Sequence, residues 1–476
     1  MIKIIYNKIY NTFRESPSFL KKFLYLIPIE YRLGGKNFIY TYNLLKESEN
    51  WNTEKLRKYQ KKQLQHLLTH AIKHVPFYSD IKITSSDPLK SLEKFPIIGK
   101  ETIKNNISKF QANNISEKKI YNVSTGGTSG KPLEFYLDNS TYGKEWAFVM
   151  TAWRRVGFKP GDKVVSFRGV EFRKADKGVF WQDNPIYNIF EMSPFHMSEE
   201  NLSKYVYKIE KLKPKYLYGY PSAISILANY IVEKEVKFPP ISAVLAISEN
   251  IYPGQRQLIE QAFKTRFFSF YGMSEKVIMA PECEYDTRYH AFPEYGITEI
   301  VDKDDNPVIE GERGELVGTG FLNFYMPFIR YRTEDYAILS KQQHCKCGRN
   351  HLLLANLIGR WHQEMIIGNN GALISLSALN LHSDNLKNVF QYQFVQKRAG
   401  ELIINIVPIK NFNHADENRI KDVFYQKVGN ELYITINLVD KIPLTDRGKF
   451  KLLIQNLKLE KLSKNQQSLN DIYLGE

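Results

Sequence analysis

Cysteine is scarce in this chain, and long apolar runs are missing. Only three cysteines are present, and two of them, Cys345 and Cys347, are separated by a single residue. An odd number with so close a pair excludes a disulfide-stapled secreted scaffold and favours reduced thiols and a metal site. No run approaches the ~18 apolar residues that span a bilayer, and the first residues lack the pattern of a secretory signal. We therefore expect a soluble cytoplasmic protein.

Acidic residues are also comparatively few. The chain has 51 Asp and Glu residues against 66 Lys and Arg residues, which gives a net charge of +15. Nucleic acid, an anionic membrane face, a polyphosphate substrate or simply a solvated lysine-rich surface would suit this charge. The basic residues are spread along the chain, so we expect no nucleic-acid-binding face. Aromatic and basic residues mix over 19–28, which is typical either of a helix on the inner membrane face or of a segment packed on a domain.

The chain has 476 residues, and this length predicts more than one hydrophobic core. From Asn52 to Pro76, apolar residues recur at helical spacing. The middle of the chain alternates short β-rich runs with helical stretches, which is typical of βαβ units around a parallel sheet. The predicted strands are 163–167, 216–218, 243–247 and 267–271, and the predicted helices are 199–212, 222–234 and 253–263.

The last part of the chain follows a different pattern. Two β-rich runs, 295–301 and 314–321, predict an antiparallel β subdomain. After Gly359, strands over 390–396 and 401–408 flank a hairpin turn, and a helix over 415–428 and a strand over 432–439 follow. We therefore predict an α/β fold with a large N-terminal domain, residues 1–359, and a small α+β C-terminal domain, residues 360–476.

The densest polar feature is Ser124-Thr-Gly-Gly-Thr-Ser-Gly-Lys-Pro132, with three glycines and four hydroxyl groups in nine residues. The backbone N–H groups and hydroxyls of such a loop can surround phosphate oxygens, and Lys131 supplies a countercharge. The spacing is not that of a Walker A loop, and a plain surface turn is the alternative. The residues predicted to bind nucleotide phosphates are Ser124, Thr125, Gly126, Gly127, Thr128, Ser129, Gly130 and Lys131.

This loop resembles the phosphate-binding loop of the adenylate-forming superfamily, which includes acyl-CoA synthetases and luciferases. Phe270-Tyr-Gly-Met-Ser-Glu275 resembles the Y-G-x-S/T-E motif of that family, and Arg330-Tyr-Arg-Thr-Glu-Asp335 resembles its R-Y-R-T-G-D motif. Gly359-Arg360 resembles the family's hinge motif, and Gly448-Lys449 resembles its catalytic-lysine motif. The helical opening that ends at His74-Val-Pro-Phe-Tyr78 is similar to the phenylacetate–CoA ligase-like branch associated with capsular polysaccharide biosynthesis.

The resemblance implies that ATP and a small-molecule carboxylate form an acyl-adenylate and pyrophosphate. The acyl group would then pass to CoA or to an amine, for example on a sugar. The small domain would act as a mobile lid that carries Lys449 to the reacting groups. In this scheme Glu275 contacts Mg²⁺ and Asp335 accepts the ribose hydroxyls. The remaining implied site residues are Arg360 at the hinge and Tyr271, Gly272 and Ser274 at the nucleotide, with the ring of Tyr271 against adenine.

Two features depart from the family pattern. Glu334 replaces the glycine before Asp335 and would add bulk and charge beside the nucleotide. The hinge reads Gly359-Arg-Trp-His-Gln-Glu364, without the usual acidic pair, so the hinge residue stays open. Lys451 follows Lys449 by two positions and is an alternative catalytic lysine. Ser193-Pro-Phe-His196 resembles a gate between the acyl and nucleotide pockets, although an ordinary core or surface histidine is the favoured interpretation.

All three cysteines fit one metal site. Cys283, His290, Cys345 and Cys347 provide three thiolates and one imidazole, the ligand set of structural tetrahedral zinc. Similar Cys/His sets occur in the phenylacetate–CoA ligase branch. Buried cysteines without a metal are the alternative, and His344 and His351 are rival fourth ligands. A different class of function is a catalytically inactive, zinc-stabilised protein that binds a nucleotide or a membrane surface.

Overall fold

The structure is a computed structural model of the whole chain. It describes residues 25–125, 133–170, 172, 178–251, 254–359, 365–379, 381, 385–409, 411–442, 452–455 and 457. Eight predicted site residues lie outside this described part, namely Gly126, Gly127, Thr128, Ser129, Gly130, Lys131, Arg360 and Lys449.

The predicted α/β fold class is confirmed by a central, mostly parallel sheet of seven strands in the order β4-β5-β3-β6-β7-β8-β9. Strands β5, β3, β6, β7 and β8 are parallel neighbours, whereas β4 and β9 run antiparallel at the edges. The strands are β3 (Val164–Phe167), β4 (Trp181–Asn184), β5 (Ile189–Met192), β6 (Tyr216–Gly219), β7 (Ala243–Ala246), β8 (Arg266–Gly272) and β9 (Met279–Pro281).

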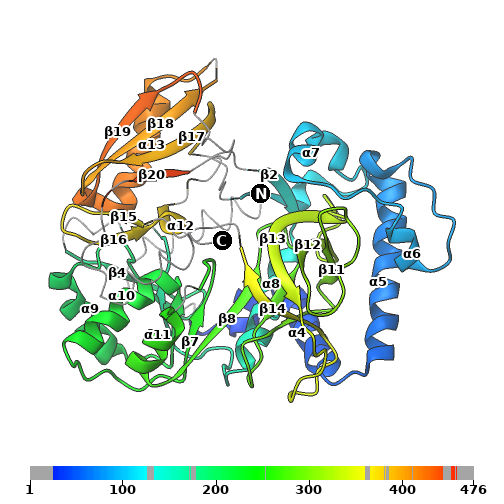
Figure 1. Cartoon of the computed structure of the whole chain (residues 1–476), viewed down its shortest axis with the longest axis horizontal. Helices are drawn as coiled ribbons and strands as arrows, with labels where there is room; N and C mark the ends of the chain where they lie inside the picture. Colours follow the sequence, from blue (N-terminus) through cyan, green and yellow to red (C-terminus); the bar gives the residue numbers. More distant parts are fainter. Residues whose placement is uncertain are drawn as a thin grey trace.

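The central strands are short, and they are covered on both faces. Every residue of β3, β6 and β7 is buried, as expected for parallel strands between layers of helices. The helices α9 (Glu199–Leu212), α10 (Pro221–Glu233) and α11 (Gln255–Phe263) connect them (Figure 1). The predicted strands and helices of this region are confirmed with shifts of one or two residues at their ends, while β4 and β5 were not predicted.

The N-terminal part of the described chain is helical. Helix α5 (Thr53–His74) begins as predicted, because the Asn52 side chain accepts a hydrogen bond from Lys55 N, and it ends before Pro76. The other helices here are α3 (Ile29–Arg32), α4 (Lys36–Ser48), α6 (Pro88–Leu92), α7 (Lys100–Asn105) and α8 (Ser140–Arg154). Short 3₁₀ turns occupy Pro76–Tyr78, Ile107–Phe110 and Glu117–Lys119.

The predicted antiparallel subdomain is a five-stranded sheet in the order β10-β14-β13-β12-β11. In Figure 1 it lies between the central sheet and α5. Its strands are β10 (Tyr289–Ala291), β11 (Gly296–Val301), β12 (Arg313–Gly320), β13 (Tyr331–Leu339) and β14 (Leu352–Ile358). A separate antiparallel pair, β1 (Ile120–Ser124) and β2 (Glu134–Asp138), flanks the glycine-rich segment.

The C-terminal part contains the predicted ββαβ arrangement. It consists of β17 (Val389–Gln396), β18 (Glu401–Pro408), α13 (His414–Val428) and β19 (Tyr433–Leu438), and β20 (Leu453–Gln455) adds a strand parallel to β17. The hairpin β15 (Met365–Ile367) and β16 (Leu373–Ser375), with α12 (Leu376–Leu379), precedes it.

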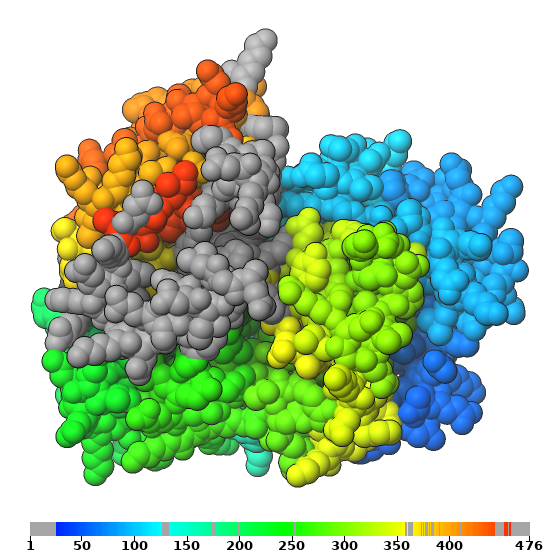
Figure 2. Space-filling view, viewed as in Figure 1, coloured from blue at the N-terminus to red at the C-terminus, as the bar shows by residue number. Residues whose placement is uncertain are grey.

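The C-terminal part packs against the α9–α10 side of the central sheet. Its apolar residues join the same core cluster as β3 and α10, and β16 contacts α10 directly. In Figure 2 the orange C-terminal part lies above the green segment that carries these helices. The boundary between residues 359 and 360 stays a prediction. Among the helices of the described chain, none combines the length and apolar character needed to cross a bilayer.

Candidate active site

A cavity of about 600 Å³ lies at the carboxyl ends of the parallel strands. Arg168 follows β3, Tyr220 follows β6, Asn250 follows β7, and the predicted motif residues Tyr271 to Glu275 end and follow β8. Open α/β sheets bind ligands at this edge, because the loops that leave adjacent strands converge there. The cavity is lined by seven predicted site residues of the described chain, namely Ser124, Thr125, Tyr271, Gly272, Ser274, Glu275 and Asp335.

The two described residues of the glycine-rich motif are held at the base of its loop. Thr125 N donates to Leu133 O at 2.9 Å, and Leu133 N donates to Thr125 Oγ1 at 3.0 Å. Thr125 is buried, and both Ser124 and Thr125 line the cavity. The hairpin of β1 and β2 therefore fixes where the glycine-rich segment leaves and rejoins the domain, next to the cavity.

Tyr271 and Asp335 come together from different sheets. The Tyr271 hydroxyl donates to Asp335 Oδ2 at 2.8 Å, and Asp335 is buried at the cavity wall. Burial and the Asp335 carboxylate raise the pKa of Tyr271 well above its ordinary value, so its hydroxyl stays a proton donor. Each carboxylate oxygen has two lone pairs. Asp335 can therefore accept hydroxyl groups of a ligand while it holds Tyr271.

Glu275 is a buried carboxylate on the same wall. It lies in the turn after β8, and its Oε1 accepts a hydrogen bond from the Tyr331 hydroxyl at 3.0 Å. Carboxylate oxygen is the preferred ligand type for Mg²⁺. A buried carboxylate facing a cavity fits a divalent cation that accompanies a polyphosphate, and Glu275 is the residue that would hold it.

The prediction that Glu334 adds bulk and charge beside the nucleotide is wrong. Glu334 is exposed, whereas the next residue, Asp335, is buried at the cavity, because neighbouring strand residues point to opposite sides. The backbone of Glu334 has a φ of 61°, in the left-handed region that favours glycine. Its N–H donates to Glu315 Oε1 at 2.9 Å, which holds this conformation.

We expect Glu334→Gly to stabilise the protein by about 1 kcal/mol, since it relieves the left-handed strain without touching the cavity. Urea denaturation of the two proteins measures this difference. Glu334→Ala is the matched control, because it removes the charge but keeps Cβ and should give no gain. An equal gain in both variants would attribute the effect to charge instead.

Lys427 and Asn250 are among the cavity residues that sequence reasoning missed. Lys427, near the end of α13, is buried and lines the cavity, so the C-terminal part contributes to its wall. Asn250 donates from Nδ2 to Gly359 O and accepts from Gly359 N, both at 2.9 Å. This two-point contact fixes the last residue before the predicted hinge. Neither residue belongs to a motif that spacing could identify.

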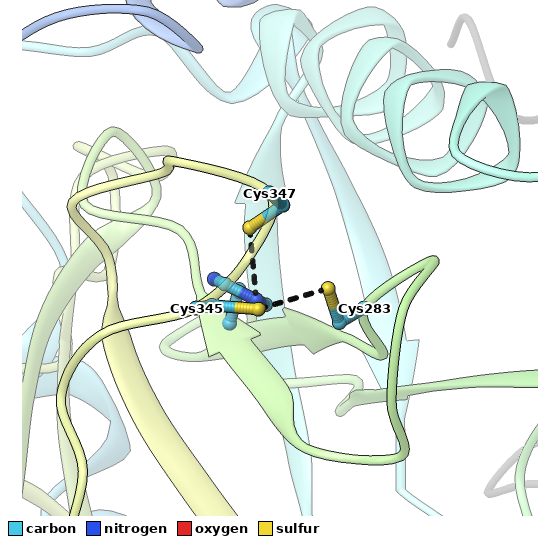
Figure 3. Close-up of side chains that lie close together, drawn as sticks. Cys283, Cys345 and Cys347 are labelled. Carbon is cyan, nitrogen blue, oxygen red and sulfur yellow. Dashed lines mark hydrogen bonds between the residues drawn. The ribbon is translucent and has the colours of Figure 1, made fainter.

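Cys283, His290, Cys345 and Cys347 converge between the β9–β10 hairpin and the β13–β14 connection (Figure 3). All four ligand atoms lie within 4.8 Å of one another, with the Cys283 and Cys345 sulfurs 3.2 Å apart and Cys347 Sγ 3.6 Å from His290 Nε2. Tetrahedral ligands at zinc–ligand distances of about 2.0–2.3 Å are separated by similar lengths. The donor set therefore fits zinc.

Burial shifts the pKa values of two residues in this cluster. It raises the pKa of the Cys283 thiol to about 12 and lowers that of His290 to about 3, in the absence of a cation. A bound cation would replace the thiol protons. The rival ligands His344 and His351 do not belong to the converging group, although both ring nitrogens of His351 are buried without a hydrogen-bond partner.

Of the two ordinary interpretations favoured for His196, a core or a surface histidine, the structure shows the core residue. His196 is buried, stacks on Phe180 with ring centroids 4.7 Å apart, and pairs through Nδ1 with Ser193 Oγ at 2.7 Å. Burial lowers the pKa of its imidazole to about 4. His196 is not among the residues that line the cavity.

Comparison with known proteins agrees with this architecture. The family model of the CapK C-terminal domain matches residues 366–456. Protein CapK of Staphylococcus aureus is 27% identical over 418 residues, which cover 84% of this chain and 89% of CapK. The chain is a CapK homologue. A phenylacetate–coenzyme A ligase of Thermus thermophilus is 25% identical over 408 residues, covering 81% of this chain and 86% of the ligase.

A solved structure has the same overall fold as this CapK homologue. The crystal structure of 2-hydroxyisobutyryl-CoA ligase in complex with 2-HIB-AMP and CoA matches with a TM-score of 0.56 at 18% identity, covering 90% of this chain and 94% of the ligase. The CapK homologue therefore has the fold of adenylate-forming CoA ligases, with a large domain and a C-terminal domain. Its relatedness to phenylacetate–CoA ligases supports the interpretation that it is an adenylate-forming ligase.

Proposed function

We propose that this protein activates a carboxylic acid with ATP and then transfers the acyl group to CoA or to an amine. The observation that carries the proposal is the convergence of Thr125, Tyr271, Glu275 and Asp335 on one cavity at the carboxyl ends of the central strands. These residues come from the three motifs that resemble nucleotide-binding motifs of adenylate-forming enzymes. The homology to phenylacetate–CoA ligases supports CoA as the acceptor.

In the first step, a carboxylate oxygen forms a bond to the α-phosphorus of ATP, and the bond from that phosphorus to the bridging oxygen breaks, releasing pyrophosphate. In the second step, a thiol or amine attacks the acyl carbon, and AMP leaves with the electron pair of the broken bond. Both reactants of the first step are anions. The site must therefore offset their repulsion most strongly in the transition state.

Each described residue has a role in this scheme. Asp335 accepts the ribose hydroxyls, and Tyr271, held by its bond to Asp335, places its ring against adenine. Ser124 and Thr125 donate hydrogen bonds to phosphate oxygens together with the glycine-rich segment. Glu275 holds Mg²⁺, which offsets the negative charge of the phosphates when it is bound.

Pyrophosphate release across a panel of carboxylic acids tests this function. Wild-type protein with ATP and Mg²⁺ should release pyrophosphate and AMP only with an accepted acid. Adding CoA or amines in parallel identifies the acceptor. Release of ADP and phosphate instead would contradict the mechanism, and absence of any nucleotide turnover would favour a protein that only binds nucleotide or a membrane surface.

The homology to CapK supports a role in capsular or surface polysaccharide biosynthesis, where a sugar amine would be the acceptor. Contact with the inner membrane face would suit such a role. The exposed aromatic residues Tyr31 and Tyr40, on α3 and α4, support that contact. Co-sedimentation with anionic vesicles tests it, and equal recovery with neutral vesicles would contradict an electrostatic attachment.

We also propose that Cys283, His290, Cys345 and Cys347 bind one structural Zn²⁺. The site would tie the hairpin between β9 and β10 to the connection between β13 and β14. Hydrogen bonds already join these two loops, because Arg288 binds Asp286 within the hairpin and donates to His344 O in the connection. The main chain of Cys283 also accepts a hydrogen bond, from Arg266. These loops lie beside the antiparallel subdomain, so the metal would brace the wall of the domain rather than take part in chemistry.

We expect purified protein to contain about one zinc per chain, and Cys345→Ser to lose the metal. The unfolding temperature should fall by roughly 5 °C or more, because metal binding stabilises only the folded state. Elemental analysis and calorimetry measure both effects. His344→Ala is the control, since His344 lies next to Cys345 but outside the converging donors. Metal loss in the control, or metal-free wild type prepared without chelator, would contradict the site.

A further inference from the structure

Arg168 stands out among the cations of the cavity wall. It directly follows β3 and lines the cavity. Two other arginines of the wall have carboxylate partners: Arg256 pairs with Glu282, and Arg288 pairs with Asp286 at 2.7 Å. Within the described chain, Arg168 forms no ion pair, and its Nε atom is buried without a hydrogen-bond partner. A guanidinium group presents five donors, so this cation still needs an acceptor.

The described surroundings of Arg168 offset its charge only in part, because Glu191 favours the charged guanidinium through space but forms no ion pair with it. Its guanidinium carbon lies over the ring of Tyr218, 5.4 Å from the ring centroid. The nearby carboxylate of Glu191 accepts hydrogen bonds from Gln182 and Asn184, both at 2.7 Å. The aromatic ring orients the guanidinium but supplies no hydrogen-bond acceptor. The positive charge of Arg168 is therefore presented to the cavity.

Glu249, which lines the cavity near Arg168, is also hydrogen-bonded to other groups. Its two carboxylate oxygens accept hydrogen bonds from the backbone N–H and the hydroxyl of Ser222, each at 3.0 Å. These contacts hold Glu249 at the start of α10, in the loop after β7. In the described part of the chain, the wall near β3 and β6 therefore provides a cation that no carboxylate pairs with directly.

The sheet register places Arg168 far from the proposed nucleotide end. Phe167, Gly219, Ala246 and Ser269 form one row of paired residues across β3, β6, β7 and β8. With strands about 4.8 Å apart, the end of β3 lies roughly 14 Å from β8. Tyr271 on β8 and Asp335 on β13 form the nucleotide end. In the proposed function the acid meets the α-phosphate near this end, so a tail that runs along the strand ends of the cavity would reach Arg168.

Resting on the proposed acid activation, we infer that Arg168 binds a second carboxylate at the tail of the acyl substrate. The protein then activates a dicarboxylic acid rather than an acid with an apolar tail. A guanidinium forms two parallel hydrogen bonds to a carboxylate, which adds geometric selectivity to charge attraction. An apolar tail would leave the buried donors of Arg168 unpaired, so the site rejects it.

The experiment compares matched acids of equal chain length, namely butyrate with succinate, valerate with glutarate, and hexanoate with adipate. Pyrophosphate release gives kcat/KM for each acid, and the ratio of dicarboxylic to monocarboxylic acid is the readout. We expect this ratio to be at least about tenfold in the wild type at the best length. Arg168→Met, which keeps length without charge, should lower the ratio at least tenfold, and Arg168→Lys should lower it less.

Lys163→Met is the matched control, because it removes an exposed cation at the opposite end of the same strand and should leave the ratio unchanged. Equal kcat/KM for every matched pair in the wild type would overturn the inference. So would an Arg168→Met variant that raises the KM for ATP and keeps the ratio, since Arg168 would then contact the nucleotide.

A direct binding measurement separates this inference from the proposed function. Calorimetric titration of the full chain with the same dicarboxylic acids needs no turnover. Weaker binding by Arg168→Met at least tenfold would support Arg168 as the tail site even if no acid released pyrophosphate, and in that case only the proposed reaction would fail. Equal binding by wild type and Arg168→Met would overturn the tail site. Circular dichroism checks that each variant is folded, and Arg168→Gln replaces Arg168→Met if it is not.

Discussion

Glu275→Gln should lower the rate of pyrophosphate release by about 10²–10³-fold. The amide has nearly the shape of the carboxylate and can still accept the hydrogen bond that the Tyr331 hydroxyl donates at 3.0 Å. It cannot supply the negative charge that a hard divalent cation prefers. The loss should therefore appear in the chemical step, with an unfolding temperature close to that of the wild type.

Single-turnover measurement of AMP formation over a range of Mg²⁺ concentrations checks this expectation. Glu334→Gln is the matched control, because it makes the same change at an exposed carboxylate that does not line the cavity. It should retain wild-type activity. An active Glu275→Gln variant with an unchanged requirement for Mg²⁺ would remove Glu275 from the proposed metal site.

Lys449→Ala should lower acyl-adenylate formation by roughly 10²–10⁴-fold with little change in ATP affinity. This lysine lies outside the described residues, and its role rests on the motif Gly448-Lys449. Its ammonium group would offset the charge that develops between the attacking carboxylate and the α-phosphate, which is a contribution made mainly in the transition state. Acyl transfer from supplied acyl-AMP should continue, because that bond has already formed.

Two lysines serve as controls for this assignment. Lys451→Ala should have a much smaller effect, and the reverse result would shift the catalytic register by two residues. Lys427→Ala tests whether the lysine that lines the cavity from α13 takes part instead. Adenylation that is unaffected by both Lys449→Ala and Lys451→Ala would contradict a lid-borne catalytic lysine.

Local patterns in the sequence predicted most of the secondary structure. Asn52 and Pro76 bound α5 because a cap and a helix breaker act within a few residues of the helix ends. The predicted helix 199–212 coincides with α9, and the buried β3, β6 and β7 follow short β-rich runs. Strands β4 and β5 escaped prediction, because their short, partly polar sequences pair with each other and gain their stability from the sheet.

Local sequence patterns could not identify which histidine joins the three cysteines as the fourth ligand of the predicted metal site. Spacing left His290, His344 and His351 as alternatives. Only the pairing of β10 with β14, which joins His290 to Leu353, brings His290 Nε2 within 3.6 Å of Cys347 Sγ. Sequence separation carries no information on such a contact, because the fold of the intervening chain sets the distance.

By itself, the sequence determined the α/β class, the motifs of the proposed nucleotide site and the ββαβ order of the C-terminal part. These are properties of neighbouring residues and of short periodic runs. Only the tertiary structure decided that Arg168, Asn250 and Lys427 line the same cavity as Asp335. Arg168 follows β3, Asn250 follows β7 and Lys427 lies on α13, and parallel pairing and the packing of the C-terminal part bring these segments together. The physical reason is that a cavity is built by side chains that meet in space, and no local pattern records which distant strands become neighbours.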